Sequence, residues 1–233
     1  MKRFYQDVAP EAAAGGHLVT LDGRGVSTPG RAPLKLPTAA LAQAVADEWA
    51  AQGEKIDPAA MPLTKLANTA IDRVTGREPD IALDVISFAK TDLLCYRAEA
   101  PAELVRRQSA GWDPVLDWAA ERYGARLAVT TGVVPVTQSD AVIALLFDPV
   151  LGEEAFALTA LHVAASVMGS LILALGLRNG RLGAEEAFGL CEIDDAFQAE
   201  QWGWDAEAAR RREHRKQEVA DAARFLALAE AGA

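Results

Sequence analysis

The stretch AFALTALHVAASVMGSLILALGL, residues Ala155 to Leu177, decides what kind of fold this chain can have. It holds no Asp, Glu, Lys or Arg, and it is long enough to cross a bilayer. Polar residues such as His162 and Ser170 interrupt it, however, and no cluster of basic residues flanks it to set an orientation in a membrane. We therefore expect a buried central helix, with a membrane anchor as the alternative.

The residues that precede this stretch predict an α+β protein. Residues 17–37 contain short alternating apolar runs, an Asp22-Gly23 turn signal and several Gly and Pro residues, a pattern typical of short strands. From Thr38 onward the pattern is mostly helical, and Thr38 itself is a candidate N-cap. We expect a small β-rich domain at residues 1–37, followed by a larger, mostly α-helical bundle domain at residues 38–233.

Three local expectations concern the helical part. Gly111 is expected to end a helix that begins near Pro101, and Asp113-Pro114 is expected to start the next one. The segment from Ala184 to Trp202 is expected to form one helix. Residues 126–136, RLAVTTGVVPV, have a β-like pattern.

Composition and charge exclude several classes of function. The 233 residues include 23 basic and 33 acidic ones, which gives a formal net charge of -10 and argues against binding to nucleic acid or anionic lipid. Two cysteines without CxxC spacing suggest a reducing compartment. The start of the chain shows neither a secretory signal nor a transit peptide.

The sequence contains no catalytic or metal-binding motif with the required residues at the required spacing. The segment Gly25 to Ala32 is a near miss to a phosphate-binding P-loop, but Arg31 and Ala32 stand where Lys and Ser/Thr are needed, so a turn is expected. The three histidines fall in different elements without metal-ligand spacing. We expect no catalytic residues, no metal and no cofactor. The alternative is an enzyme with a cryptic site between the domains, around Asp195, Cys95 or His162.

The expected helix at Ala184 to Trp202 carries two apolar stripes. One stripe consists of Leu190, Ile193 and Phe197. The other consists of Phe188, Cys191, Asp195, Gln198 and Trp202. Because the second stripe mixes a carboxylate and an amide with aromatic rings, it fits either a buried hydrogen-bonded network or a face that binds a partner protein. Of the two, we favour the partner face.

Several long motifs resemble those of a known family, the assembly chaperones for the ATP synthase alpha subunit. They are DEWAAQGEKIDPAAMPLTKLANTAID, TDLLCYRAEAPAELVRRQSAGWDPVLDWAAERYG, GSLILALGL and EIDDAFQAEQWGWDAEA, which follow one another between Asp47 and Ala208. The resemblance implies a small β domain joined to a larger helical domain, without a cofactor. It also implies that the chain holds newly made alpha subunit until the beta subunit takes its place.

The resemblance further indicates which residues contact the partner. Prominent positions of the family pattern are occupied here by Trp49, Asp194, Asp195, Gln198 and Trp202. Ala196 departs from the pattern, because many members have another acidic residue at that position. No catalytic role is implied for the Cys-Tyr-Arg and Trp-Asp-Pro segments. We expect a monomer in the bacterial cytoplasm, or in the mitochondrial matrix if the chain is a processed eukaryotic member.

Overall fold

The computed structural model describes residues 1–132 and 134–231 and divides into two compact units. The first unit comprises Met1–Glu78, Glu154–Ala160 and the segment from Arg224 onward. The second comprises Pro79–Glu153 and Leu161–Ala223. The division after Glu78 lies well beyond the domain boundary expected at residue 37. Neither of the two units ends at residue 37, and the small β-rich domain at residues 1–37 stays a prediction.

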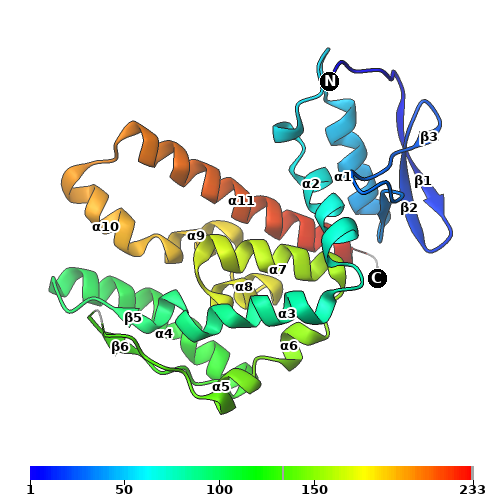
Figure 1. Cartoon of the computed structure of the whole chain (residues 1–233). Coiled ribbons are helices and arrows are strands. Elements are labelled where there is room, and N and C mark those ends of the chain that lie inside the picture. Colours follow the sequence, from blue (N-terminus) through cyan, green and yellow to red (C-terminus); the bar gives the residue numbers. More distant parts are fainter. Residues whose placement is uncertain (133, 232–233) are drawn as a thin grey trace. The chain divides into compact units, whose positions relative to one another are not determined.

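The first unit contains a small antiparallel sheet (Figure 1). Its strands are β1 (Val8–Ala13), β2 (Gly16–Leu21), β3 (Arg24–Gly25) and β4 (Lys35–Leu36). Strand β2 pairs with all of the others. Helices follow, namely α1 (Ala39–Ala50), the short turn η1 (Pro58–Ala60), α2 (Pro62–Thr69) and the π-helical turn η2 (Ala70–Val74). The expected α+β class, with a strand region before a mostly helical part, is confirmed.

Helix α1 begins as the sequence predicts. The hydroxyl of Thr38 accepts a hydrogen bond from the backbone N–H of Leu41 and donates one to the carbonyl of Leu228, which lies in the same unit. Leu41 and Val45, spaced four residues apart, are completely buried. The apolar face of α1 therefore forms part of the core of the first unit.

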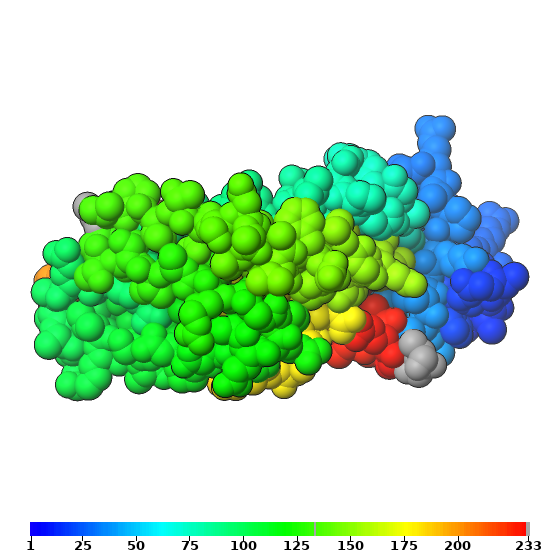
Figure 2. Space-filling view, turned by 90° about the horizontal axis from the view of Figure 1, so that it is seen from below, coloured from blue at the N-terminus to red at the C-terminus, as the bar shows by residue number. Residues whose placement is uncertain are grey.

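The second unit is largely helical. Its elements before the apolar stretch are α3 (Glu78–Ser87), η3 (Phe88–Thr91), η4 (Leu93–Cys95), β5 (Tyr96–Arg97), α4 (Ala102–Tyr123), β6 (Thr130–Thr131), α5 (Asp140–Ala144) and α6 (Asp148–Leu151). Those that follow are α7 (Ala155–Met168), α8 (Leu171–Arg178), α9 (Ala184–Cys191), α10 (Ile193–Trp202) and α11 (Ala206–Glu230). Helices α7 and α11 contribute residues to both units. Figure 2 shows the green segments, from α4 to α6, as a broad continuous surface.

The apolar stretch is buried, as expected, but it forms two helices. Helix α7 ends at Met168, Gly169 adopts a left-handed φ of 66°, and the Ser170 hydroxyl accepts a hydrogen bond from the N–H of Leu173 to cap α8. Glycine tolerates this conformation at no steric cost and serine is a preferred N-cap, so the Gly169-Ser170 pair ends one helix and begins the next. Among the described residues, no helix has both the length and the apolarity needed to cross a membrane.

The expected break in the helix after Pro101 is wrong. Helix α4 runs without interruption through Gly111 and Pro114, although proline cannot donate the hydrogen bond of the preceding turn. One face of α4 is buried along its whole length, which favours a continuous helix over the local preference of these two residues. The buried residues are Leu104, Gln108, Trp112, Val115 and Ala119.

The expected single helix from Ala184 to Trp202 is also wrong, because Glu192 separates α9 from α10. The Glu192 carboxylate is almost completely buried and lies 2.7 Å from Arg215 and 3.2 Å from Arg212 of α11. The carbonyl of Leu190, next to the break, accepts a hydrogen bond from the Trp112 indole. These contacts compensate for the helical hydrogen bonds that the break gives up.

The β-like pattern at residues 126–136 produces only one short strand. Strand β6 covers Thr130–Thr131 and pairs in parallel with β5. Val133 of this segment lies outside the described residues.

Gly111 offers a test of how closely α4 lies to the break between α9 and α10. A Cβ atom at this position would come within 2.9 Å of the side chains of Leu190 and Ile193. We predict that Gly111→Val lowers the free energy of unfolding by about 1–3 kcal/mol, because the added methyl groups overpack the contact. Gly189→Val is the matched control, since nothing lies within 4 Å of a Cβ there. Equal urea denaturation midpoints for the two variants would contradict the prediction.

Candidate protein-binding surface

The Cys-Tyr-Arg and Trp-Asp-Pro segments form one packing unit around Arg97. The guanidinium of Arg97 donates from Nε to the carbonyl of Leu94 at 2.9 Å and lies 2.8 Å from the carboxylate of Asp113. It also lies over the ring of Trp112, 5.1 Å from its centroid. Since the Arg97 side chain is only 9% exposed, these contacts replace water around its charge. The polar and aromatic residues of these two segments therefore pack against one another.

Gln108 joins this packing unit to helix α10. Its side-chain oxygen accepts a hydrogen bond from the N–H of Ala98 at 2.8 Å, and its side-chain nitrogen donates to the carboxylate of Asp194 at 2.6 Å. Gln108 is 1% exposed, so both ends of its amide are satisfied inside the protein. Burial raises the pKa of the Asp194 carboxyl above its ordinary value, although the hydrogen bond from Gln108 acts in the opposite direction. Asp194 thus anchors α10 to the framework.

Three other residues of α10 and one that follows the helix are exposed. Asp195 is 56% exposed on its side chain, Gln198 is exposed, and Trp202 is 78% exposed. Trp204, two residues after Trp202, is 42% exposed and was not singled out by the sequence analysis. We call Asp195, Gln198, Trp202 and Trp204 the α10 face. The WGW repeat was the available signal for Trp204, because two tryptophans around a glycine rarely both enter a core.

The second stripe read from the sequence is divided by the break at Glu192. Phe188 and Cys191 of α9 are buried, whereas Asp195, Gln198 and Trp202 of α10 are exposed. A single buried network across the whole stripe is excluded by this exposure, and the partner face stays a prediction for the α10 part. The α9 part belongs to the core, and the α10 part is available to a partner.

Helix α10 is held along its length as well as at its first turn. Arg107 of α4 lies 2.6 Å from Glu200 and places its guanidinium 5.3 Å from the centroid of the Phe197 ring. Glu192 and its two arginines hold the start of the helix from the other side. The α10 face is therefore presented on a fixed backbone, which lowers the entropic cost of binding.

Of the residues proposed for a cryptic enzyme site, Cys95 is not activated as a nucleophile. Cys95 is completely buried, and burial raises the pKa of its thiol to about 12, so the reactive thiolate is not populated at neutral pH. His162 is half-buried and packs edge-on against Phe88 at 6.3 Å. Within residues 1–132 and 134–231, no group of three or more His, Cys, Asp or Glu side chains is arranged to hold a metal ion.

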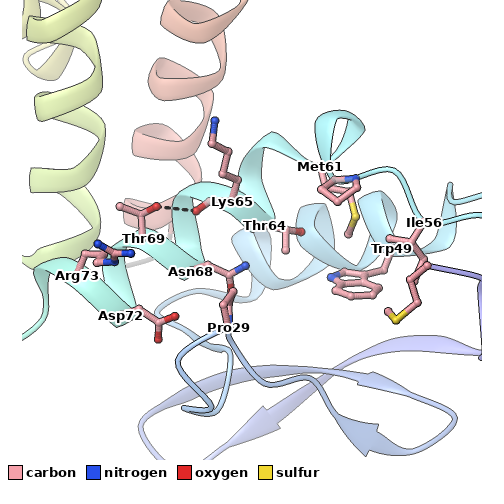
Figure 3. A pocket seen from close by; sticks show the side chains of 12 residues that line it. Pro29, Trp49, Ile56, Met61, Thr64, Lys65, Asn68, Thr69, Asp72 and Arg73 are labelled. Carbon is pink, nitrogen blue, oxygen red and sulfur yellow. Dashed lines mark hydrogen bonds between the residues drawn. The ribbon is translucent and has the colours of Figure 1, made fainter.

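Trp49 lies in the first unit, beside a separate pocket of about 460 Å³ (Figure 3). Its carbonyl accepts a hydrogen bond from the hydroxyl of Tyr5, and its ring meets the Tyr5 ring edge-on at 5.8 Å. The Glu48 carboxylate fixes the neighbouring helix α2 by accepting hydrogen bonds from the N–H groups of Leu63 and Thr64. The sequence pattern indicates Trp49, but it does not indicate the residues of α2 that line the rest of this pocket.

The near miss to a P-loop is a turn, as expected. Thr28 and the N–H of Gly30 both donate hydrogen bonds to the carboxylate of Asp72, at 2.6 and 2.8 Å. Arg31 adopts a left-handed φ of 69°. This loop is thus held against η2 of the first unit and does not lead into a helix.

Comparison with known proteins places this geometry in a class of assembly chaperones. The ATP12 chaperone protein family matches residues 2–120. The mitochondrial protein atp12 of Schizosaccharomyces pombe is 24% identical over 214 residues, which cover 87% of this chain and 74% of that protein. The crystal structure of Atp12 from Paracoccus denitrificans is 46% identical, with a TM-score of 0.94 and 98% of each chain covered.

A second solved structure comes from a candidate chaperone of Agrobacterium tumefaciens. It is 42% identical to this chain, with a TM-score of 0.92, and the match covers 97% of this chain and 85% of that one. The chain therefore belongs to the ATP12 chaperone family, a family of ATP synthase assembly chaperones, and the resemblance seen in its motifs is confirmed.

The two adjacent aspartates of α10 should differ in their effect on stability. We predict that Asp194→Ala lowers the free energy of unfolding by about 1–3 kcal/mol, because it leaves the buried Gln108 amide without its acceptor. Asp195→Ala should cost less than about 1 kcal/mol, since this exposed carboxylate only complements the helix N-terminus and lies 3.9 Å from Arg215. Urea denaturation measures both values. A larger loss for Asp195→Ala would contradict the assignment.

Asp92 gives the stability of the chain a specific pH dependence. Its carboxylate is completely buried and accepts hydrogen bonds from Ser170 and from the N–H groups of Leu94 and Ile172. Burial raises its pKa from 3.8 to about 6. Between these values the folded chain holds a proton that the unfolded chain has released, so the free energy of unfolding falls as the pH rises through this window.

We therefore predict that the free energy of unfolding of Asp92→Asn, minus that of the original chain, increases by up to about 3 kcal/mol as the pH rises from about 4 to about 6. The reason is that asparagine has no proton to lose in this range. Chemical denaturation at a series of pH values measures the difference between the two chains. Parallel pH profiles would show that Asp92 does not titrate in this range.

Proposed function

We propose that this chain binds the alpha subunit of ATP synthase before that subunit joins the beta subunit. The observation that carries the proposal is the α10 face, where Trp202 stands exposed with Asp195 on a helix that Gln108 holds in place, and Trp204, also exposed, follows the end of that helix. Membership of the ATP synthase assembly chaperone family supports the role in assembly. The choice of the alpha subunit rests on the motifs that the chain shares with that family.

The chemistry of the α10 face fits an unassembled subunit. A subunit without its neighbours exposes an apolar interface, which would otherwise associate with other copies. Exposed tryptophans supply large, rigid contact areas, and tryptophan is among the residues that dominate binding energy in protein interfaces. The carboxylate of Asp195 and the amide of Gln198 add polar groups that select one orientation of the partner.

Reversible shielding follows from the limited extent of this face. Trp202 follows directly on the part of α10 that Arg107 holds and precedes Gly203, which has a left-handed φ of 77°. The contact area consists of one short helix and the residues after it, so the beta subunit can displace the chaperone by offering alpha a larger interface. The chaperone needs no energy source for this exchange.

The remaining expectations complete the proposal. The chain acts as a monomer without cofactor, metal or nucleic acid, and its function is binding without catalysis. Its relatives include two bacterial proteins and one mitochondrial protein of a yeast. We place this chain in the bacterial cytoplasm, with the mitochondrial matrix as the location for a eukaryotic member.

Capture of separately purified alpha and beta subunits by the immobilised chain tests the proposal. The original chain should capture alpha and not beta, because only alpha is its client. Trp202→Ala should weaken the capture of alpha by roughly 10- to 30-fold, since loss of a central interface tryptophan costs on the order of 2 kcal/mol. Asp195→Lys should weaken it by about 10-fold through charge reversal.

Matched control substitutions lie on exposed positions outside the α10 face. Glu121→Lys repeats the charge reversal near the end of α4, and Leu83→Ala repeats the removal of an exposed apolar side chain on α3. Both controls should capture alpha as well as the original chain does. Capture of beta equal to that of alpha would contradict the proposal. So would undiminished capture of alpha by folded Trp202→Ala and Asp195→Lys.

A further inference from the structure

A second surface with the character of a binding site lies in the first unit, separate from the α10 face. We call it the Trp49 groove, and it has a volume of about 460 Å³. Its apolar part is lined by Met1, Pro29, Trp49, Ile56, Pro58 and Met61. Its polar part is lined by Thr64, Lys65, Asn68, Thr69, Asp72 and Arg73. Figure 3 shows Trp49, Ile56 and Met61 at one end, and Asn68, Asp72 and Arg73 toward the other.

The indole N–H of Trp49 has no acceptor in the described part of the chain, although the nitrogen is buried. A buried donor without a partner costs about 1–3 kcal/mol, and such groups are rare in proteins. Asn68, half-buried on the facing helix, likewise makes no side-chain hydrogen bond within the described residues. A bound molecule that brings a hydrogen-bond acceptor would recover this cost with a small movement of the ring.

The charges of the Trp49 groove favour an acidic occupant. Lys65 and Arg73 are exposed, and neither forms an ion pair with any described residue. The carboxylate of Asp72 already accepts hydrogen bonds from Thr28 and from the N–H of Gly30, which direct its charge toward the loop. The chain as a whole carries a net charge of -10, so two cations without an ion pair give this groove a positive charge that the molecule as a whole lacks.

The length of the groove suits a short stretch of extended peptide. The residues of α2 and the π-helical turn η2 that line the groove run from Thr64 to Arg73, which corresponds to about 14 Å at about 1.5 Å per residue. An extended chain covers this length with about four residues, at about 3.3 Å each. A hydrogen bond supports the assignment of η2 as a π-helical turn, because the N–H of Thr75 donates to the carbonyl of Ala70, five residues earlier. Such π-helical turns occur frequently at functional sites.

We propose that the Trp49 groove binds a short extended segment of the client subunit, with an apolar side chain at the Trp49 end and a carboxylate at the Arg73 end, while Lys65 adds positive charge beside the middle of the groove. The segment's backbone carbonyl accepts the hydrogen bond of the Trp49 indole. This inference rests on the proposed function, because it takes the client to be the alpha subunit. It adds a second contact, in a different unit of the chain, and states what that contact selects.

Fluorine NMR of the full chain labelled with 5-fluorotryptophan separates this inference from the proposed function. The chain contains five tryptophans, so single Trp→Phe substitutions assign each signal. Trp202 and Trp204 report on the α10 face, and Trp49 reports on the groove. The probes are the purified alpha subunit and short synthetic peptides that tile its sequence.

We expect the Trp49 signal to shift when alpha is added, and also with those peptides that combine an apolar residue with a nearby Asp or Glu. The double variant Lys65→Glu/Arg73→Glu should bind these peptides at least about 10-fold more weakly, because it turns two attractive charges into repulsive ones. The control Arg24→Glu/Lys90→Glu changes the net charge equally at exposed positions outside the groove and should bind them normally.

Four results would overturn the inference. A shift of the Trp202 and Trp204 signals without a shift of the Trp49 signal would contradict binding in the groove and would leave the proposed function unaffected. If no tryptophan signal shifts when alpha is added, both the inference and the proposed function are contradicted. Peptide binding that survives Lys65→Glu/Arg73→Glu would show that the occupant is not acidic. A Trp49 signal that moves with the concentration of this chain alone would show that a second copy occupies the groove.

Discussion

The buried amide of Gln108 is the contact on which the arrangement of the second unit depends. An amide in the interior must satisfy both its oxygen and its nitrogen, or it destabilises the fold. Here the oxygen binds the backbone after β5 and the nitrogen binds Asp194 at the start of α10. One side chain of α4 therefore connects the residue after β5, ten positions earlier, with α10, 86 positions later. Arg97 and Trp112, whose side chains stack on one another, are buried neighbours of these residues in the sequence.

The break at Glu192 follows from the same arrangement. Because α9 and α10 are separate helices, the residues of α10 turn away from the core that α9 helps to form. The buried Glu192 carboxylate and its arginines stabilise this turn, and Gly111 lets α4 approach it closely. The exposed tryptophans are thus a consequence of how the core is built. A continuous helix would have carried the stripe of Phe188 and Cys191 on into Trp202.

Much of this fold could be predicted from local patterns, and the failures have a common cause. The burial of the apolar stretch and the Thr38 cap of α1 depend on neighbouring residues, and both predictions are confirmed. The course of α4 through Pro114 and the break at Glu192 depend on residues far away in the sequence. The same applies to the surface, where no pattern distinguishes anchored Asp194 from exposed Asp195. Nor does a sequence reveal that the Trp49 indole lacks an acceptor.

The central claim is that α10 binds the alpha subunit, and hydrogen exchange of the whole chain with and without alpha tests it most directly. The account predicts slower exchange of backbone amides in α10 and in residues 203–205 when alpha is present, with no change when beta is added. Amides of α5 and α6 should exchange at the same rate throughout, as an internal reference. Unchanged exchange in α10 at a concentration of alpha that saturates binding would contradict the account, as would equal protection by beta.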